Sequence, residues 1–261
     1  MQPMLAILKR EISMYFKSPI AYVLLAIYTF VSGLVFCLYL FQGYALITSE
    51  LAFLQSLFFI IIPLMTMKSF SEENKNKTDL LLLTSPCKIG DIVLGKYLAA
   101  VFMFLCMSTI TLVHIIITML LGGIIDLPIL GTYIIYFLTA FAYIAIGLFC
   151  SSLTENQIIA GIVSMLIFLL FSIYSTISNL IANLIASAVN SFDRIFGLVP
   201  SNVKDSISTN VASSLNWLNP SNRLAEFGRG IFTIPPIIFL FTYSAIFIYF
   251  TCKVLQRRRW N

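Results

Sequence analysis

The sequence predicts an all-α integral membrane protein with six transmembrane helices, preceded by an amphipathic helix at the membrane interface. Of its 261 residues, 59% are hydrophobic and only 10% are Asp, Glu, Lys or Arg, against about 25% charged residues in an ordinary soluble domain. So few charges cannot cover a soluble core of this size, and lipid is therefore the expected solvent. The composition disfavours soluble enzymes, nucleic-acid-binding proteins and disulfide scaffolds.

The interfacial helix is expected at residues 4–17. Four apolar or aromatic side chains recur there at helical spacing, namely Leu5, Leu8, Ile12 and Tyr15. Polar residues occupy another face, which is typical of a helix that rests in the headgroup layer. Ser18-Pro19 ends this helix and turns the chain towards the membrane.

Six later segments are apolar and long enough to cross a hydrocarbon core of about 30 Å, which takes about 20 helical residues. They lie at about 22–41, 53–70, 94–121, 129–152, 157–182 and 234–254. Uncharged sequence continues after the fifth span, because residues 156–192 contain no charge. We expect this helix either to continue beyond the membrane or to bend near Asn179 and Asn183.

The distribution of cations predicts the orientation. Twelve of the sixteen Lys and Arg residues lie near the two termini or between residues 68 and 96. Cytoplasmic flanks collect Lys and Arg, so both termini and the 71–91 connection are expected in the cytoplasm, and 183–231 at the outer face. The cell (inner or cytoplasmic) membrane is the expected location.

No catalytic residue, metal site or bound cofactor is predicted in this chain. Residues 90–97 nearly match the phosphate-binding loop, but Tyr97 replaces the Ser or Thr that would hold magnesium, and no apolar strand precedes the loop. We therefore expect that the chain does not hydrolyse ATP by itself.

His114 is the only histidine and lies deep in the third predicted span. An ionisable group at that depth is a functional hypothesis by default. We favour a neutral imidazole that is hydrogen-bonded to a neighbouring helix, because every carboxylate is expected at the end of a span or in a connection. The same expected lack of intramembrane acids disfavours ion-driven transport.

The 71–91 connection is expected to be a docking surface. It combines charged residues with the apolar run Leu80–Leu83, and an apolar patch with a charged rim is typical of an interface. Thr78 is a predicted N-cap for a short helix over 79–83. The alternative is that the leucines pack against their own bundle or lie among the lipid headgroups.

Several segments, in order along the chain, resemble the permease subunits of ABC transporters of the ABC-2 type, particularly the compact six-span bacterial members of the gliding-motility-like group. They are Lys9-Arg10-Glu11, Ser18–Tyr22, Pro63–Met67, Ser71-Glu72-Glu73, Thr78, Leu82–Pro86, Gly95-Lys96, Ser151–Gln157 and Glu226–Gly230. The resemblance covers almost the whole chain.

This resemblance implies an exporter that works by alternating access, in which a separate ABC-type ATPase binds ATP and magnesium and docks on the 71–91 connection. A second permease subunit, identical or different, and membrane lipid are the other implied partners, with no nucleic acid. Seven residues would transmit the motion of the ATPase: Glu72, Glu73, Thr78, Leu82, Thr84, Ser85 and Pro86. Glu226, Phe227 and Arg229 would shape the outer gate. Asp79 departs from the family pattern by one position.

Two other functions remain open at this point. One is an ion-driven secondary transporter or channel, and the other is a membrane anchor or assembly protein that recruits an ATPase. The sequence does not indicate the cargo, because residues that line such pathways resemble any apolar helix interface.

Overall fold

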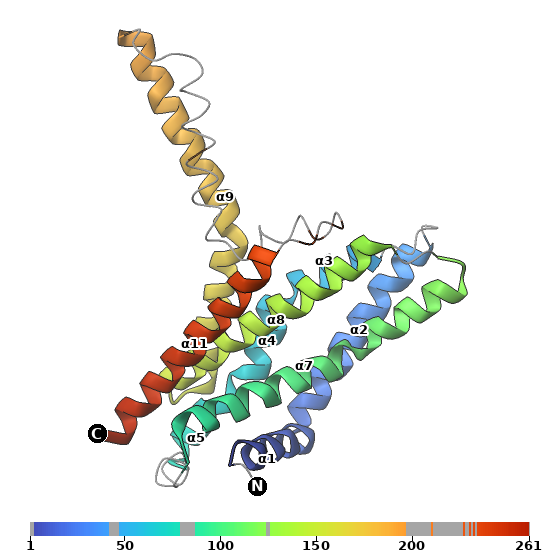
Figure 1. The fold of residues 1–261 in the computed structure, drawn as a ribbon, viewed down its shortest axis with the longest axis vertical. Coiled ribbons are helices and arrows are strands. Elements are labelled where there is room, and N and C mark those ends of the chain that lie inside the picture. Colours follow the sequence, from blue (N-terminus) through green and yellow to red (C-terminus); the bar gives the residue numbers. More distant parts are fainter. Residues whose placement is uncertain are drawn as a thin grey trace.

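The computed structural model describes residues 3–41, 47–78, 87–123, 126–196, 210, 227, 230, 232 and 234–260. The regular elements in these ranges are all α-helices (Figure 1). The all-α prediction is therefore confirmed for the part of the chain that the structure describes.

The first two helices are separated by a single residue. Helix α1 (Pro3–Lys17) packs across α7, and α2 (Pro19–Phe41) begins directly after Ser18 (Figure 1). The side chains of α1 that are buried are Ile7 and Glu11, whereas Leu5 on the predicted apolar face is 50% exposed. The helix is rotated in this way because Glu11 forms an ion pair with Lys96 of α7.

The second apolar segment is a broken helix in three pieces. Helices α3 (Ile47–Ser56), α4 (Phe58–Thr66) and α5 (Lys68–Lys75) follow one another, and the chain bends by 55° between α3 and the α4–α5 part. Pro63 cannot donate a backbone hydrogen bond to the Phe59 carbonyl, which weakens this segment near the bend. The helical structure begins at Ile47, before the predicted start of the span at residue 53.

Helix α7 (Ile89–Leu120) is followed by α8 (Leu127–Leu153), which lies in the centre of the bundle. Helix α11 (Ile234–Trp260) packs along α8, and α9 (Gln157–Phe196) packs on α8 and α4. With 40 residues, α9 is about 60 Å long, twice the thickness of a hydrocarbon core. It continues as one helix and extends well past the other helices (Figure 1).

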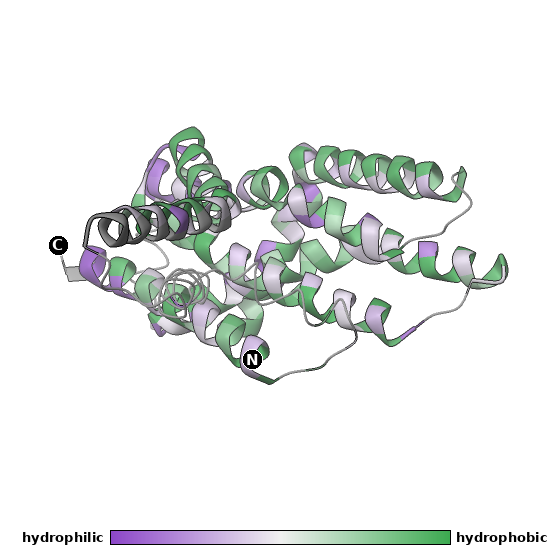
Figure 2. Ribbon diagram, turned by 90° about the horizontal axis from the view of Figure 1, so that it is seen from above, coloured by the Kyte–Doolittle hydropathy of each residue, from purple (hydrophilic) through white to green (hydrophobic). Residues whose placement is uncertain are grey.

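The core and the outside of the bundle are both apolar. Inside, the rings of Phe58, Phe104 and Tyr136 pack on one another with centroid distances from 4.9 to 5.8 Å. Outside, large apolar side chains such as Phe30 (69% exposed) and Ile116 (57% exposed) are largely uncovered by protein, and the helices are hydrophobic along most of their length (Figure 2). Among the described residues, five helices are long and apolar enough to span a membrane, and the bent second segment makes a sixth if it counts as one span.

Candidate coupling site

Helix α5 is the short amphipathic continuation of the broken second segment. Phe70, Ser71 and Asn74 are buried, while Lys75 and the turn after it are exposed. The helix ends where the Thr78 amide and hydroxyl both donate to the Glu73 carbonyl. It therefore presents one face to the bundle and the other to the solvent at the start of the predicted docking connection.

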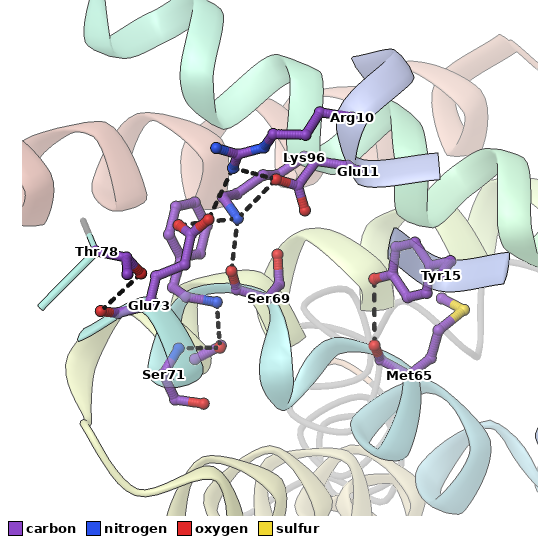
Figure 3. A network of polar contacts seen from close by, with 11 residues as sticks. Arg10, Glu11, Tyr15, Met65, Ser69, Ser71, Glu73, Thr78 and Lys96 are labelled. Atoms are coloured by element: carbon purple, nitrogen blue, oxygen red, sulfur yellow. Dashed lines mark hydrogen bonds and ion pairs between the residues drawn. The ribbon is translucent and has the colours of Figure 1, made fainter. Parts of the chain in front are cut away.

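Four charged side chains from three helices meet beside α5 (Figure 3). Arg10 Nη2 of α1 lies 2.6 Å from Glu11 Oε1 and 2.7 Å from Glu73 Oε1 of α5. Lys96 Nζ of α7 lies 3.1 Å from Glu11 Oε1 and 3.0 Å from Glu73 Oε2. Lys96 also donates to the Ser69 carbonyl at 2.7 Å. The cluster thus ties α5 to both α1 and α7.

The charges in this cluster balance one another. The Lys96 side chain is 1% exposed, and a buried ammonium group needs compensating anions, which Glu11 and Glu73 supply. The Phe70 ring lies 5.0 Å from Lys96 Nζ and adds a cation–π contact. Desolvation lowers the pKa of Arg10, but the hydrogen bonds and charges of Glu11 and Glu73 outweigh it and raise that pKa overall.

Helix α8 holds α5 from the other side. Ser151 Oγ accepts hydrogen bonds from the amides of Phe70 and Ser71 at 3.0 and 3.2 Å, and donates to the Met67 carbonyl at 3.0 Å. A fourth bond runs from Asn74 Nδ2 to the Thr154 carbonyl at 3.4 Å. The three Ser151 bonds satisfy backbone groups that the break between α4 and α5 leaves free.

A cavity of about 610 Å³ opens beside the charged cluster. Its lining comes from α1, α2, α4, α5 and α7 and includes the apolar side chains of Leu24, Leu64 and Met103. The predicted coupling residues Glu72, Glu73 and Thr78 all line it. The structure therefore brings together the three predicted coupling residues that it describes.

The remaining predicted site residues fall differently. Leu82, Thr84, Ser85, Pro86, Glu226 and Arg229, and the predicted helix over 79–83, lie outside the described residues. Phe227 is fully buried, and its ring contacts Phe232 at a centroid distance of 5.6 Å. Its carbonyl packs so closely on Gly131, near the start of α8, that a side chain at residue 131 would collide with it. Phe227 therefore lies at the end of α8 opposite to Ser151.

Three members of the charged cluster were not predicted as site residues. Arg10, Glu11 and Lys96 entered the sequence analysis only through motifs and the count of cations. A signal exists for Lys96, since it lies just inside the start of the span predicted at 94–121. A lysine there needs a partner carboxylate, but the sequence does not say which one.

The prediction that no carboxylate is available to His114 is wrong. His114 Nδ1 lies 2.7 Å from Glu50 Oε1, and the two side chains are 5% and 1% exposed. The expected hydrogen bond to a neighbouring helix does exist, but its partner is an acid. Glu50 escaped notice because the span was expected to begin at residue 53, whereas α3 begins at Ile47.

The apolar surface and the number of spanning helices define the class, a multi-pass helical membrane protein. A family model described as "ABC-2 family transporter protein" matches residues 5–233. The chain belongs to this family, and it is accordingly a permease subunit of an ABC transporter, the kind of membrane subunit that has an ABC ATPase as its partner. No curated protein matches the chain.

Proposed function

We propose that the chain is the membrane subunit of an exporter in which a separate ATPase, with its bound ATP and magnesium, docks on the 71–91 connection and drives alternating access. Both termini and this connection lie in the cytoplasm, and the subunit resides in the cell membrane. Two permease subunits, identical or different, enclose the path. The direction of transport is inferred from the resemblance to the ABC-2 group and does not rest on any contact in the structure.

The attachment of α5 on two sides is the observation that carries this proposal. Glu73 joins α5 to α1 and α7 through Arg10 and Lys96, and Ser151 joins it to α8. A displacement applied to the residues after α5 therefore reaches three helices through short polar contacts. A loop whose only role is to connect two spans needs no such attachment.

Copurification tests the docking. Gentle extraction of the native complex is expected to yield an ATPase in stoichiometric amount with this chain. Leu82→Asp places a charge in the proposed contact and is expected to abolish copurification. Asn156→Asp is the matched control, because it adds the same charge at the α8–α9 turn, where Asn156 Oδ1 already accepts from the Ile158 amide and Asp can replace it. Undiminished binding by Leu82→Asp contradicts the assignment.

The Glu50–His114 pair gives the ion-driven alternative an observation in its favour, because it places an acid inside the bundle. Proteoliposomes that contain only this chain separate the two functions. Uptake that follows an ion gradient without any ATPase would support the alternative. Cargo-stimulated ATP hydrolysis by the reconstituted pair would support the exporter, and would also distinguish it from a membrane anchor.

A further inference from the structure

A second buried polar cluster lies in the half of the bundle away from α5. It brings together Ser32 of α2, Glu50 of α3 and His114 of α7, which are 0%, 1% and 4% exposed. His114 lies six residues before the end of α7 at Leu120, or about 9 Å along the helix axis. None of the predicted coupling residues takes part, so the cluster needs a separate explanation.

Both hydrogen bonds in this cluster reach the same carboxylate oxygen. Ser32 Oγ donates to Glu50 Oε1 at 2.8 Å, and His114 Nδ1 lies 2.7 Å from that atom. The other oxygen, Glu50 Oε2, is buried and has no hydrogen-bond partner among the described residues. The Phe36 ring stacks on the imidazole at a centroid distance of 4.2 Å and an angle of 7°, and covers one face of it.

This geometry indicates where the protons are. With the Glu50 proton on Oε2, Oε1 is a carbonyl oxygen that accepts both from the Ser32 hydroxyl and from a hydrogen on His114 Nδ1. An ionised carboxylate would leave its second oxygen charged, buried and without a donor, which is costly in an apolar bundle. A proton on Oε2 removes that charge. Neutral His114 beside protonated Glu50 leaves the cluster uncharged.

The surroundings of Glu50 contain no strong cation within the described ranges. Its one ion-pair contact there is His114. The other titratable groups that act on it electrostatically are Tyr28 of α2 and Tyr133 and Tyr136 of α8. The Tyr28 and Tyr136 hydroxyls are bonded to each other at 2.6 Å, and the Tyr133 hydroxyl donates to the Thr111 carbonyl. Among the described residues, only His114 and Ser32 make contacts that would stabilise an ionised Glu50 carboxylate.

We propose that Ser32, Glu50 and His114 form a proton-binding site, in which Glu50 Oε2 carries one proton while the bundle is closed. Separation of α2, α3 and α7 admits water, and the proton passes from Oε2 to that water and leaves a hydrated carboxylate. The bend of 55° between α3 and the α4–α5 part divides the segment that carries Glu50 from the segment that carries the coupling residues. The proposal concerns this chain alone and does not depend on the docking of an ATPase.

Opening and proton release are then linked. The closed form binds one more proton than the open form, so low pH favours the closed bundle and high pH favours the open one. For one proton, the ratio of open to closed molecules changes by at most tenfold for each pH unit.

The presence of the proton on Glu50 is tested first by spectroscopy. His114 is the only histidine, so labelling with ¹⁵N-histidine gives the nitrogen signals of this imidazole alone. In lipid nanodiscs at neutral pH we expect a neutral ring protonated at Nδ1, together with an infrared band of a carboxylic acid that is absent from Glu50→Gln. An imidazolium signal, or the absence of such a band, would overturn the proposal. If Glu50→Gln does not fold, ¹³C-glutamate labelling of the unsubstituted chain identifies the band by its isotope shift.

The linkage is tested by chemical access to a cysteine placed near the site. Thr118 lies one turn from His114 and is buried, and its hydroxyl donates to the His114 carbonyl of its own helix. Thr118→Cys is introduced in a background without the five native cysteines, and its modification rate by a small impermeant thiol reagent is measured against pH. Glu50→Gln in the same background is the matched control, because its neutral amide imitates the protonated acid and its pH dependence reports only the thiol chemistry.

We expect the ratio of the two rates to rise with pH, by up to tenfold for each pH unit. A ratio that stays constant from acidic to alkaline pH, with the histidine signal of a folded bundle in both variants, would overturn the linkage.

Discussion

Lys96 Nζ of α7 lies 3.0 Å from Glu73 Oε2 of α5. This ion pair joins α5, which ends before the 79–86 segment, to α7, which begins after it. Both side chains are largely buried, at 1% and 16% exposed. The two ends of the proposed docking connection are therefore fixed to each other at its base, and to α1 through Arg10 and Glu11.

Replacement of this lysine is expected to destabilise the bundle. Lys96→Met leaves Glu11 and Glu73 with only Arg10 as a counter-charge. We expect the free energy of unfolding to fall by about 3 kcal/mol, the lower end of the range for broken buried ion pairs, because Arg10 still contacts both acids. The free energy of unfolding is measured in mixed micelles. Lys9→Met, at an exposed position of α1, is the control and should change stability by at most about 0.5 kcal/mol. Equal stability of the two variants would contradict the role of Lys96.

Ser151 is expected to matter more than its neighbour Ser152. Ser151→Ala leaves the amides of Phe70 and Ser71 and the Met67 carbonyl without their bonds to Oγ, which should cost about 1–3 kcal/mol. Ser152→Ala is the matched control, since Ser152 is equally buried but donates only to the Phe149 carbonyl of its own helix. Transport-coupled ATP hydrolysis should also fall more in Ser151→Ala. The reverse order of effects would be inconsistent with an attachment of α5 to α8.

Close packing between α4 and α8 depends on Gly147. A methyl group at this position would collide with the Thr66 hydroxyl, so Gly147→Ala should destabilise the bundle by about 1–3 kcal/mol, as overpacked cores do. Thr66→Ala in the same chain should restore part of the loss. Gly33→Ala is the control, because nothing lies within 4 Å of the added methyl, and it should stabilise α2 by up to about 1 kcal/mol. Thermal unfolding of the unsubstituted chain and of these three variants gives the comparison.

The proposed orientation is tested with an exposed position after the second segment. Lys75 is exposed, and Lys75→Cys in a background without native cysteines should react with an impermeant maleimide in inside-out vesicles but not in intact cells. Labelling from outside intact cells would place the 71–91 connection on the wrong side of the membrane for an ATPase.

The helical class and the apolar exterior were predictable because they depend on composition and on runs of about 20 apolar residues. Glu72, Glu73 and Thr78 were grouped through the family resemblance, and they do line one cavity; their coupling role stays a prediction. The partners of the buried charged residues were not predictable from the sequence. Lys96 pairs with Glu11 across 85 residues, and His114 pairs with Glu50 across 64. Such contacts depend on how helices pack, and one sequence contains no record of that packing.

Glu50 illustrates how a small error in a boundary changes a functional argument. Placing the start of the second span at residue 53 put this acid in a connection, and the lack of intramembrane acids then counted against ion binding. The extension of α3 by six residues, to Ile47, moves Glu50 into the bundle. The length of α9 shows the opposite case, since the absence of charge from residue 156 to 192 had already indicated a continuing helix as one of two outcomes.

The attachments of α5 also determine what kind of motion an ATPase could produce. A hinge at the base of the connection would allow α5 to swing alone, but the bonds to Lys96 on one side and Ser151 on the other leave no such hinge. Torque applied there would turn α1, α5, α7 and α8 together as one rigid body. Each cycle of ATP hydrolysis would then produce a small rotation of these four helices together, with little bending of any single helix.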